Sequence, residues 1–138
     1  MVIGKSYVKK CERAAENYAV DYLNCIITDR ERGSGSFQRR DFLGCLDVIG
    51  KRASGVWVCI QATIGSHRKV IERQRKIEQI AWHSTDIVQI LQLRFEQQGR
   101  SKSWYFNVFD YSQFSRKKWL THVVEVPKQW FLAYKREA

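Results

Sequence analysis

The stretch Val56–Ile60 limits the possible folds more than any other part of the chain, because all of its side chains are apolar or aromatic. Successive side chains of a β-strand point to opposite faces of the sheet, so this unbroken run predicts a strand buried on both faces. Gly55 precedes the run, and the triplet Gln61-Ala62-Thr63 follows it. We therefore expect a central strand that ends in polar side chains, within a sheet flanked by helices.

Hydrophobic periodicity predicts the elements around this strand. Apolar residues at three-or-four spacing indicate one helix from Lys5 to Asn24 and another from Ser66, its N-cap, to Trp82. Further strands are predicted at Cys25–Arg32, Phe42–Ile49 (broken after Gly50), Ile87–Phe95, Trp104–Phe109 and, at an edge, Val123–Pro127. The order is helix, three strands, helix and at least two more strands. It predicts an α/β fold with a mixed central β-sheet flanked by helices, and residues 1–138 as a single domain.

The chain carries 24 Lys and Arg against 14 Asp and Glu, a formal net charge of +10. Such an excess favours a polyanionic partner, most often a nucleic acid. A membrane surface is the rival, but no run reaches the roughly 18 apolar residues that a spanning helix needs. The polar and basic start, Met1–Lys10, predicts no secretory leader. We expect DNA as the partner, and neither a membrane nor a small-molecule cofactor.

The four cysteines, Cys11, Cys25, Cys45 and Cys59, are spread singly through apolar stretches. There is no Cys-x-x-Cys pair and no histidine at the spacing of a zinc site. Isolated cysteines in such surroundings behave as small buried hydrophobes. We predict reduced core thiols in a cytoplasmic protein, although their number alone leaves a disulfide open.

Asp47 is unusual because it lies in an otherwise apolar segment, Leu43–Ile49. Burying a carboxylate there is costly unless it is ion-paired, hydrogen-bonded or bound to a metal. Gln61 and Thr63, two residues apart, share one face of the next strand. If the two strands are neighbours, Asp47 and Gln61 converge. The alternatives are a turn cap or an ion pair with Arg30 for Asp47, and an ordinary strand role for Gln61.

These residues resemble a known family when Cys11-Glu12-Arg13 in the first helix and Gly33-Ser34-Gly35-Ser36 before Asp47 are added. The order of a helix glutamate, a basic Ser-Gly-Ser loop, an aspartate and a polar triplet is similar to the PD-(D/E)xK nucleases. The archaeal-type Holliday-junction resolvases are most similar, over roughly residues 4–82. The resemblance implies a restriction-endonuclease-like core with catalytic Glu12, Asp47, Gln61 and Thr63. Glu12, Asp47 and Gln61 would bind Mg²⁺ or Mn²⁺, and Thr63 would lie near the attacking water.

The chain departs from the family pattern at two positions. Gln61 stands where the family has a glutamate, and Thr63 where it has a lysine. An amide oxygen suits a hard cation but binds it more weakly, and the missing lysine removes electrostatic stabilisation of the transition state. Glu16, one helical turn from Glu12, is an alternative ligand. Candidates for the missing positive charge are Lys51, Arg68 and Lys69.

Cations flank the Gly-Ser loop and follow one side of the second helix, where they are expected to contact phosphates. The predicted DNA-binding residues are Arg30, Arg32, Ser34, Gly35, Ser36, Arg39, Arg40, Arg68, Lys69, Arg73 and Lys76. An aromatic group is interpreted as core or homodimer interface rather than as a base-stacking platform. Its members are Trp104, Tyr105, Phe106, Phe109 and Tyr111. The resemblance also implies a homodimer, whose two-fold symmetry suits a four-way junction.

The sequence therefore favours a metal-dependent endodeoxyribonuclease that hydrolyses phosphodiester bonds in DNA, with branched, Holliday-junction-like DNA as a candidate substrate. The alternative is a catalytically impaired DNA-binding protein on the same fold, motivated by Gln61 and Thr63. A third hypothesis is a dimeric protein-interaction module whose basic surface is incidental.

Overall fold

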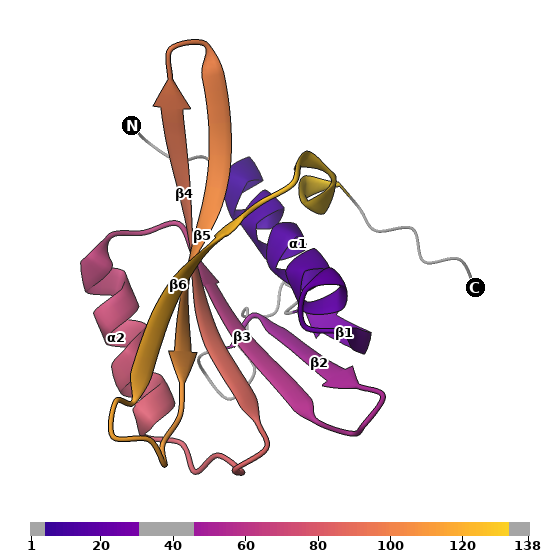
Figure 1. Ribbon diagram of the computed structural model, residues 1–138, viewed down its shortest axis with the longest axis vertical. Helices are drawn as coiled ribbons and strands as arrows, with labels where there is room; N and C mark the ends of the chain where they lie inside the picture. The colour runs from indigo at the N-terminus through magenta and orange to yellow at the C-terminus, as the bar shows by residue number, and fades with distance from the viewer. Residues whose placement is uncertain (1–4, 31–45, 133–138) are drawn as a thin grey trace, which may run out of the picture.

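The computed structural model describes residues 5–30 and 46–132. Within these residues, six strands form one sheet in sequence order, and all neighbours are antiparallel except β3 and β4 (Figure 1). The elements are α1 (Lys5–Asp21), β1 (Cys25–Arg30), β2 (Val48–Arg52), β3 (Trp57–Thr63), α2 (His67–Glu78), β4 (Ile87–Gln98), β5 (Ser101–Tyr111), β6 (Trp119–Glu125) and the short 3-10 helix η1 (Lys128–Phe131). The parallel pair requires a crossover, which α2 provides. The predicted mixed α/β class is confirmed.

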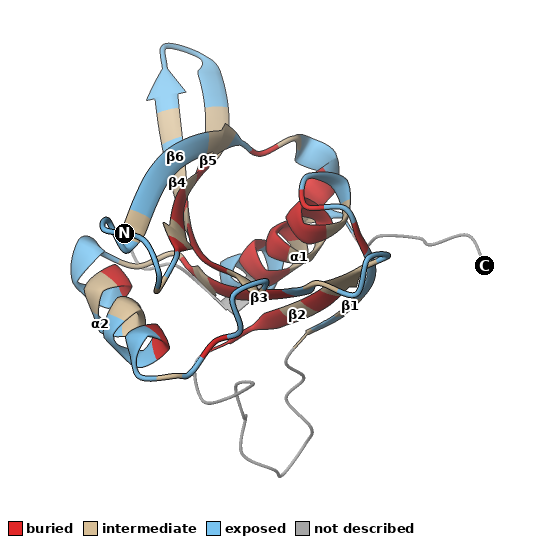
Figure 2. Cartoon of the chain, turned by 60° about the horizontal axis from the view of Figure 1, so that its bottom comes forward, coloured by how far each residue is buried: buried red, intermediate tan, exposed pale blue. Residues whose placement is uncertain are grey.

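The two helices cover opposite faces of the sheet (Figure 2). Along β3, Val58 and Ile60 belong to the apolar cluster under α1, whereas Cys59 belongs to the cluster under α2. This alternation follows from the two-residue period of a strand. From α2, Val70 and Ile77 are fully buried. The strand predicted to be central is therefore covered on both faces, as its apolar sequence indicates.

Both helices end earlier than predicted. α1 ends at Asp21 rather than Asn24, because Asn24 adopts a left-handed conformation with φ 61°. α2 ends at Glu78 rather than Trp82, whose indole Nε1 donates a hydrogen bond to Ile77 O at 2.8 Å. These ends are set by backbone geometry and a side-chain contact that hydrophobic periodicity does not report.

The predicted break after Gly50 is wrong, since β2 continues through this residue to Arg52. A Cβ atom on Gly50 would lie 2.7 Å from Cys25 Sγ and 3.2 Å from Ile27 O, so glycine is needed here for the close approach of β1. The chain turns later, at Gly55, whose φ is 89°. The predicted strand residues 42–45 lie outside the described residues.

The hairpin of β4 and β5 is longer than predicted and pairs to Gln98↔Ser101 across the two residues Gly99 and Arg100. The edge strand β6 is confirmed and ends before Pro127. The core interpretation of the aromatic group holds for its buried members, Phe106, Phe109 and Tyr111, whereas Trp104 and Tyr105 are half-buried. Cys11, Cys25 and Cys59 are buried as predicted, and Cys45 lies outside the described residues.

Replacing Gly50 by alanine should destabilise the protein by about 1–3 kcal/mol, because the added methyl group overpacks the β1–β2 contact. Urea unfolding measures the loss. In a double-mutant cycle with Cys25→Ala, the cost of Gly50→Ala should be smaller than in the parent, since the Cys25 sulfur is gone. An unfolding midpoint that Gly50→Ala leaves unchanged would contradict the close approach of the two strands.

Candidate metal and nucleic-acid site

Asp47 lies immediately before β2 and opposite the end of β3, because Val48 pairs with Ile60 in the antiparallel register. Its backbone N–H donates to Ile60 O at 2.9 Å. Its carboxylate Oδ2 accepts one hydrogen bond from Gln61 Nε2 at 3.0 Å and another from Ala62 N at 2.8 Å. The structure therefore brings Asp47 and Gln61 together, as the prediction of neighbouring strands required.

Gln61 is 3% exposed, and its Oε1 has no hydrogen-bond partner among the described residues. A buried carbonyl oxygen left unpaired costs about 1–3 kcal/mol, so its presence needs a physical explanation. The same amide group donates to Asp47, so the Gln61 oxygen and the Asp47 carboxylate belong to one buried polar cluster. Amide and carboxylate oxygens are ligands of hard divalent cations. The donor chemistry fits the Mg²⁺ or Mn²⁺ that the family resemblance implies.

α1 brings a second carboxylate, Glu12, which is 8% exposed. The adjacent Cys11 donates Sγ to Thr63 O at 3.8 Å and so connects α1 to the end of β3. Burial raises the pKa of the Cys11 thiol, and the negative charges of Asp47 and Glu12 raise this pKa further. Both carboxylates are therefore close enough to act on the same buried thiol.

Glu16, the alternative to Glu12, has a different partner. Its Oε2 lies 3.4 Å from Nε of Arg30 in β1. Of the two glutamates, Glu12 is thus the buried one, and Arg30 is engaged by α1. In residues 5–30 and 46–132, no group of three or more His, Cys, Asp or Glu side chains could hold a metal ion. The candidate set has two carboxylates and depends on the Gln61 amide for its third ligand.

Thr63 stands in the place of the family lysine and is 7% exposed. Its Oγ1 accepts a hydrogen bond from Gly65 N at 3.1 Å, in the turn that leads to α2. Lys69, in the first turns of α2, lies along this turn, because a Cβ on Gly65 would lie 2.1 Å from Lys69 Cδ. The Lys69 side chain therefore passes next to the end of β3.

The other two candidate cations are engaged elsewhere. Lys51 Nζ lies 4.9 Å from the centroid of the Trp57 ring, at the start of β3 rather than at its end. Arg68 Nε lies 3.7 Å from Glu72 Oε1, on the exposed side of α2. Of the three, Lys69 is the cation that the structure places beside the site.

The predicted basic stripe of α2 faces solvent. Lys69 and Lys76 are exposed, as is Arg68, and Arg73 is half-buried. The sequence of α2 holds five Lys and Arg against two Glu, while Val70 and Ile77 face the core. The other predicted DNA-binding residues lie outside the described part of the chain, namely Arg32, Ser34, Gly35, Ser36, Arg39 and Arg40.

A chain of polar side chains that leads away from the site was not predicted. Gln92 Nε2 donates to Gly65 O at 2.9 Å, and Asn107 Nδ2 donates to Gln92 Oε1 at 3.1 Å. Arg94 Nε then donates to Asn107 Oδ1 at 2.9 Å. The alternation of leucine and polar side chains in residues 91–94 is the sequence signal that indicates such a polar face.

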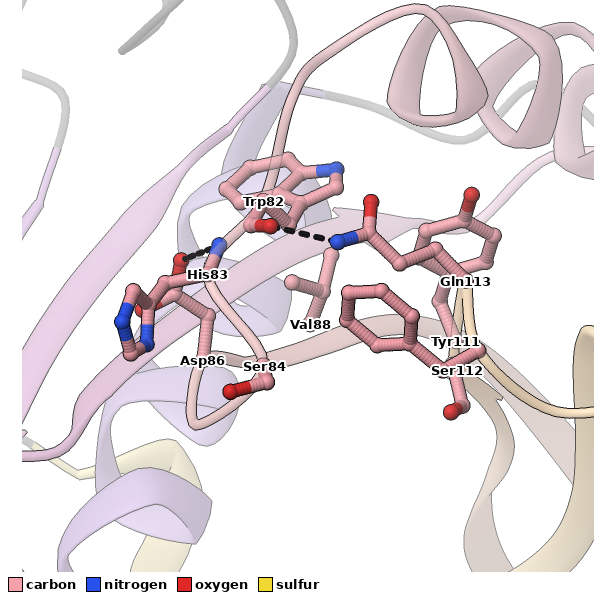
Figure 3. A pocket seen from close by; sticks show the side chains of 9 residues that line it. Trp82, His83, Ser84, Asp86, Val88, Tyr111, Ser112 and Gln113 are labelled. Carbon is pink, nitrogen blue, oxygen red and sulfur yellow. Dashed lines mark hydrogen bonds between the residues drawn. The ribbon is translucent and has the colours of Figure 1, made fainter.

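A cavity of about 30 Å³ lies beyond the C-terminal end of α2 (Figure 3). Its polar groups bond locally: Gln113 Nε2 donates to Trp82 O, and His83 N donates to Asp86 Oδ2 at 2.8 Å. A volume of this order holds about one water molecule. Neither Asp47 nor Gln61 lines the cavity, so it is separate from the candidate site.

Comparisons with protein-family models, curated proteins and solved structures found no match. In the described residues, no helix is both long and apolar enough to cross a membrane. The nuclease resemblance therefore stays a prediction, which depends on the sequence motif and the geometry of the site.

If Gln61 Oε1 is a metal ligand, Mg²⁺ or Mn²⁺ should raise the melting temperature of the protein, and Gln61→Leu should abolish this rise. Gln89→Leu is the matched control. Gln89 is also buried in the sheet, but both ends of its amide are used, by Tyr18 at 2.8 Å and Asp110 at 3.0 Å. This control should lower the melting temperature yet keep the rise with metal. Equal rises in parent and Gln61→Leu protein would remove Gln61 from the ligand set.

Proposed function

We propose that this protein is a metal-dependent endodeoxyribonuclease on a restriction-endonuclease-like core. The observed order of helix, three strands, helix and further strands agrees with the order in the PD-(D/E)xK resemblance. The residues that correspond to the family's site, Glu12, Asp47, Gln61 and Thr63, are all buried and belong to α1, the start of β2 and the end of β3. The proposal depends above all on the unpartnered Oε1 of Gln61, in the amide group that donates to Asp47.

In this proposal, Glu12, Asp47 and Gln61 would hold Mg²⁺ or Mn²⁺. When bound, such a cation polarises a phosphodiester and promotes attack by water. The chain itself positions the ligands. Two donated hydrogen bonds fix the Asp47 carboxylate, and the contact of Cys11 with Thr63 holds α1 at the end of β3.

Lys69 is proposed as the substitute for the family lysine. A positive charge near the scissile phosphate stabilises the charge that develops in the transition state. Lys69 reaches the turn after Thr63 from α2 rather than from β3. Its long stem lies along Gly65, which would keep the ammonium group near the site without a charged residue in the strand.

DNA is the proposed substrate because the net charge of +10 and the exposed cations of α2 suit a polyanion. A homodimer belongs to the proposal through the family resemblance and its two-fold symmetry. A non-catalytic DNA-binding protein is the second candidate. It is favoured by Thr63, whose hydroxyl bonds to Gly65 N in the place of a lysine, and by the neutral amide at Gln61.

Asp47→Ala should abolish cleavage while DNA binding remains, because the substitution removes the carboxylate and leaves the basic surface intact. Parent and variant are incubated with duplex, single-stranded, flapped and four-way-junction DNA in Mg²⁺ or Mn²⁺, and cleavage and retention are both measured. Asp29→Ala, at an exposed aspartate of β1, should behave like the parent. Asp47→Asn provides a second variant of closer shape if Asp47→Ala unfolds.

Binding of DNA without cleavage in either metal would support the second candidate instead. Absence of binding at low salt would remove both.

Lys69→Met should lower the single-turnover cleavage rate by about 100-fold, since it removes the charge but keeps the apolar stem over Gly65. Lys76→Met is the control, with the same charge change two turns further along α2. Each variant should reduce the salt dependence of DNA binding by about one unit, while only Lys69→Met slows cleavage of bound DNA. Equal cleavage rates in the two variants would assign Lys69 to phosphate binding alone.

A further inference from the structure

The hairpin of β4 and β5 extends well beyond the rest of the sheet. The last β3–β4 pair is Thr63↔Gln92, and the last β5–β6 pair is Tyr105↔Glu125, yet the hairpin pairs continue to Gln98↔Ser101. Residues 93–104, here called the arm, therefore project from the body (Figure 1). The six residues after Gln92 in β4 correspond to about 20 Å of extended chain.

The direction of the arm relates it to the candidate site. β3 and β4 are parallel, so the arm leaves the body at the same end of the sheet as Gln61 and Thr63. The polar chain from Gly65 through Gln92 and Asn107 to Arg94 connects this end of β3 with the base of the arm. A polymer bound at the site and running along this face would meet the arm.

The outer part of the arm has an unusual composition. Residues 97–103 are Gln, Gln, Gly, Arg, Ser, Lys and Ser, without an apolar side chain or a carboxylate, and residues 97–102 are all exposed. Protein interfaces are built around apolar and aromatic side chains and are poor in Lys and Ser. Glutamine, arginine and serine side chains, by contrast, donate hydrogen bonds to phosphates and base edges.

The arm is supported at its base. An isolated two-stranded hairpin is only marginally stable in water. Here the Phe95 and Trp104 rings lie 4.9 Å apart, and Trp104 also contacts Tyr7 of α1 at 5.9 Å and Phe131 of η1 at 5.7 Å. Apolar contacts at the base thus hold a polar tip away from the body, an arrangement suited to contacts with a partner.

We infer that the arm is a second nucleic-acid-binding element, a β-ribbon that enters the major groove of duplex DNA held at the candidate site. The major groove is about 12 Å wide and admits a two-stranded ribbon. Arg100 and Lys102 would contact phosphates, and Gln97 and Gln98 the groove. The inference depends on the proposed DNA partner but not on hydrolysis.

The charge of the arm is tested by Arg100→Ser with Lys102→Ser. The control, Lys117→Ser with Lys118→Ser, removes two exposed lysines from the turn at the opposite end of β5. Binding of a fluorescent duplex without divalent metal is measured over a salt series. The arm variant should lose about two units of salt slope and at least tenfold in affinity (an estimate of about one unit per phosphate contact), whereas the control should bind like the parent. Equal affinity of arm variant and parent, or equal losses in both variants, would overturn the inference.

The length of the arm gives a second test. Removing Gln97, Gln98, Ser101 and Lys102 keeps the Glu96↔Ser103 pair and the Gly99-Arg100 loop, and shortens the arm by about 7 Å. The hydroxyl-radical footprint on duplex DNA should then shrink by about two base pairs at one end, given about 3.4 Å per base pair. An unchanged footprint would show that the arm does not touch DNA.

The outcomes separate this inference from the proposed function. A parent that binds and cleaves DNA, with an arm variant that does both equally well, contradicts the arm alone. A parent that binds no duplex at low salt contradicts both. Light scattering of parent and arm variant is measured in parallel. A dimer that dissociates when Arg100 and Lys102 are replaced would identify the arm as a protein interface and overturn the nucleic-acid assignment.

Discussion

The double pairing of β3 is the constraint on which the rest of the structure depends. This strand is antiparallel to β2 and parallel to β4, and both of its faces are covered. The parallel neighbour requires a crossover, which places α2 next to the end of β3. The antiparallel neighbour sets the register that brings Asp47 to Gln61. The candidate site therefore lies where these two pairings end.

The site combines features that do not favour stability. Two carboxylates, Glu12 and Asp47, are withdrawn from water, and Gln61 has a buried oxygen without a partner in the described part of the chain. Buried polar groups of this kind weaken a fold unless hydrogen bonds or a ligand compensate them. Departures from good packing and hydrogen bonding are concentrated at functional sites in natural proteins. This contrast with the apolar clusters on either side of β3 distinguishes the site from ordinary core.

The cations are arranged around this buried centre rather than within it. α2 exposes its basic side chains, Lys69 extends along the turn after Thr63, and the arm carries Arg100 and Lys102 beyond the same end of the sheet. A polyanion on this face would meet positive charge on both sides of the polar cluster. Such an arrangement concentrates binding free energy on the backbone of a nucleic acid. The neutral residues Gln61 and Thr63 leave binding intact and make hydrolysis the question for experiment.

The sequence by itself determined the mixed α/β class, the central strand, both helices and the candidate residues Asp47 and Gln61, because hydrophobic periodicity and a charge in an apolar segment are local signals. It did not determine the path of β2 through Gly50, the choice of Glu12 over Glu16, or the position of Lys69. These depend on which atoms meet across the sheet: Cys25 against Gly50, Arg30 against Glu16, and Lys69 against Gly65. Only the tertiary structure decides such contacts, since strand register and helix placement bring together residues that are distant in the chain.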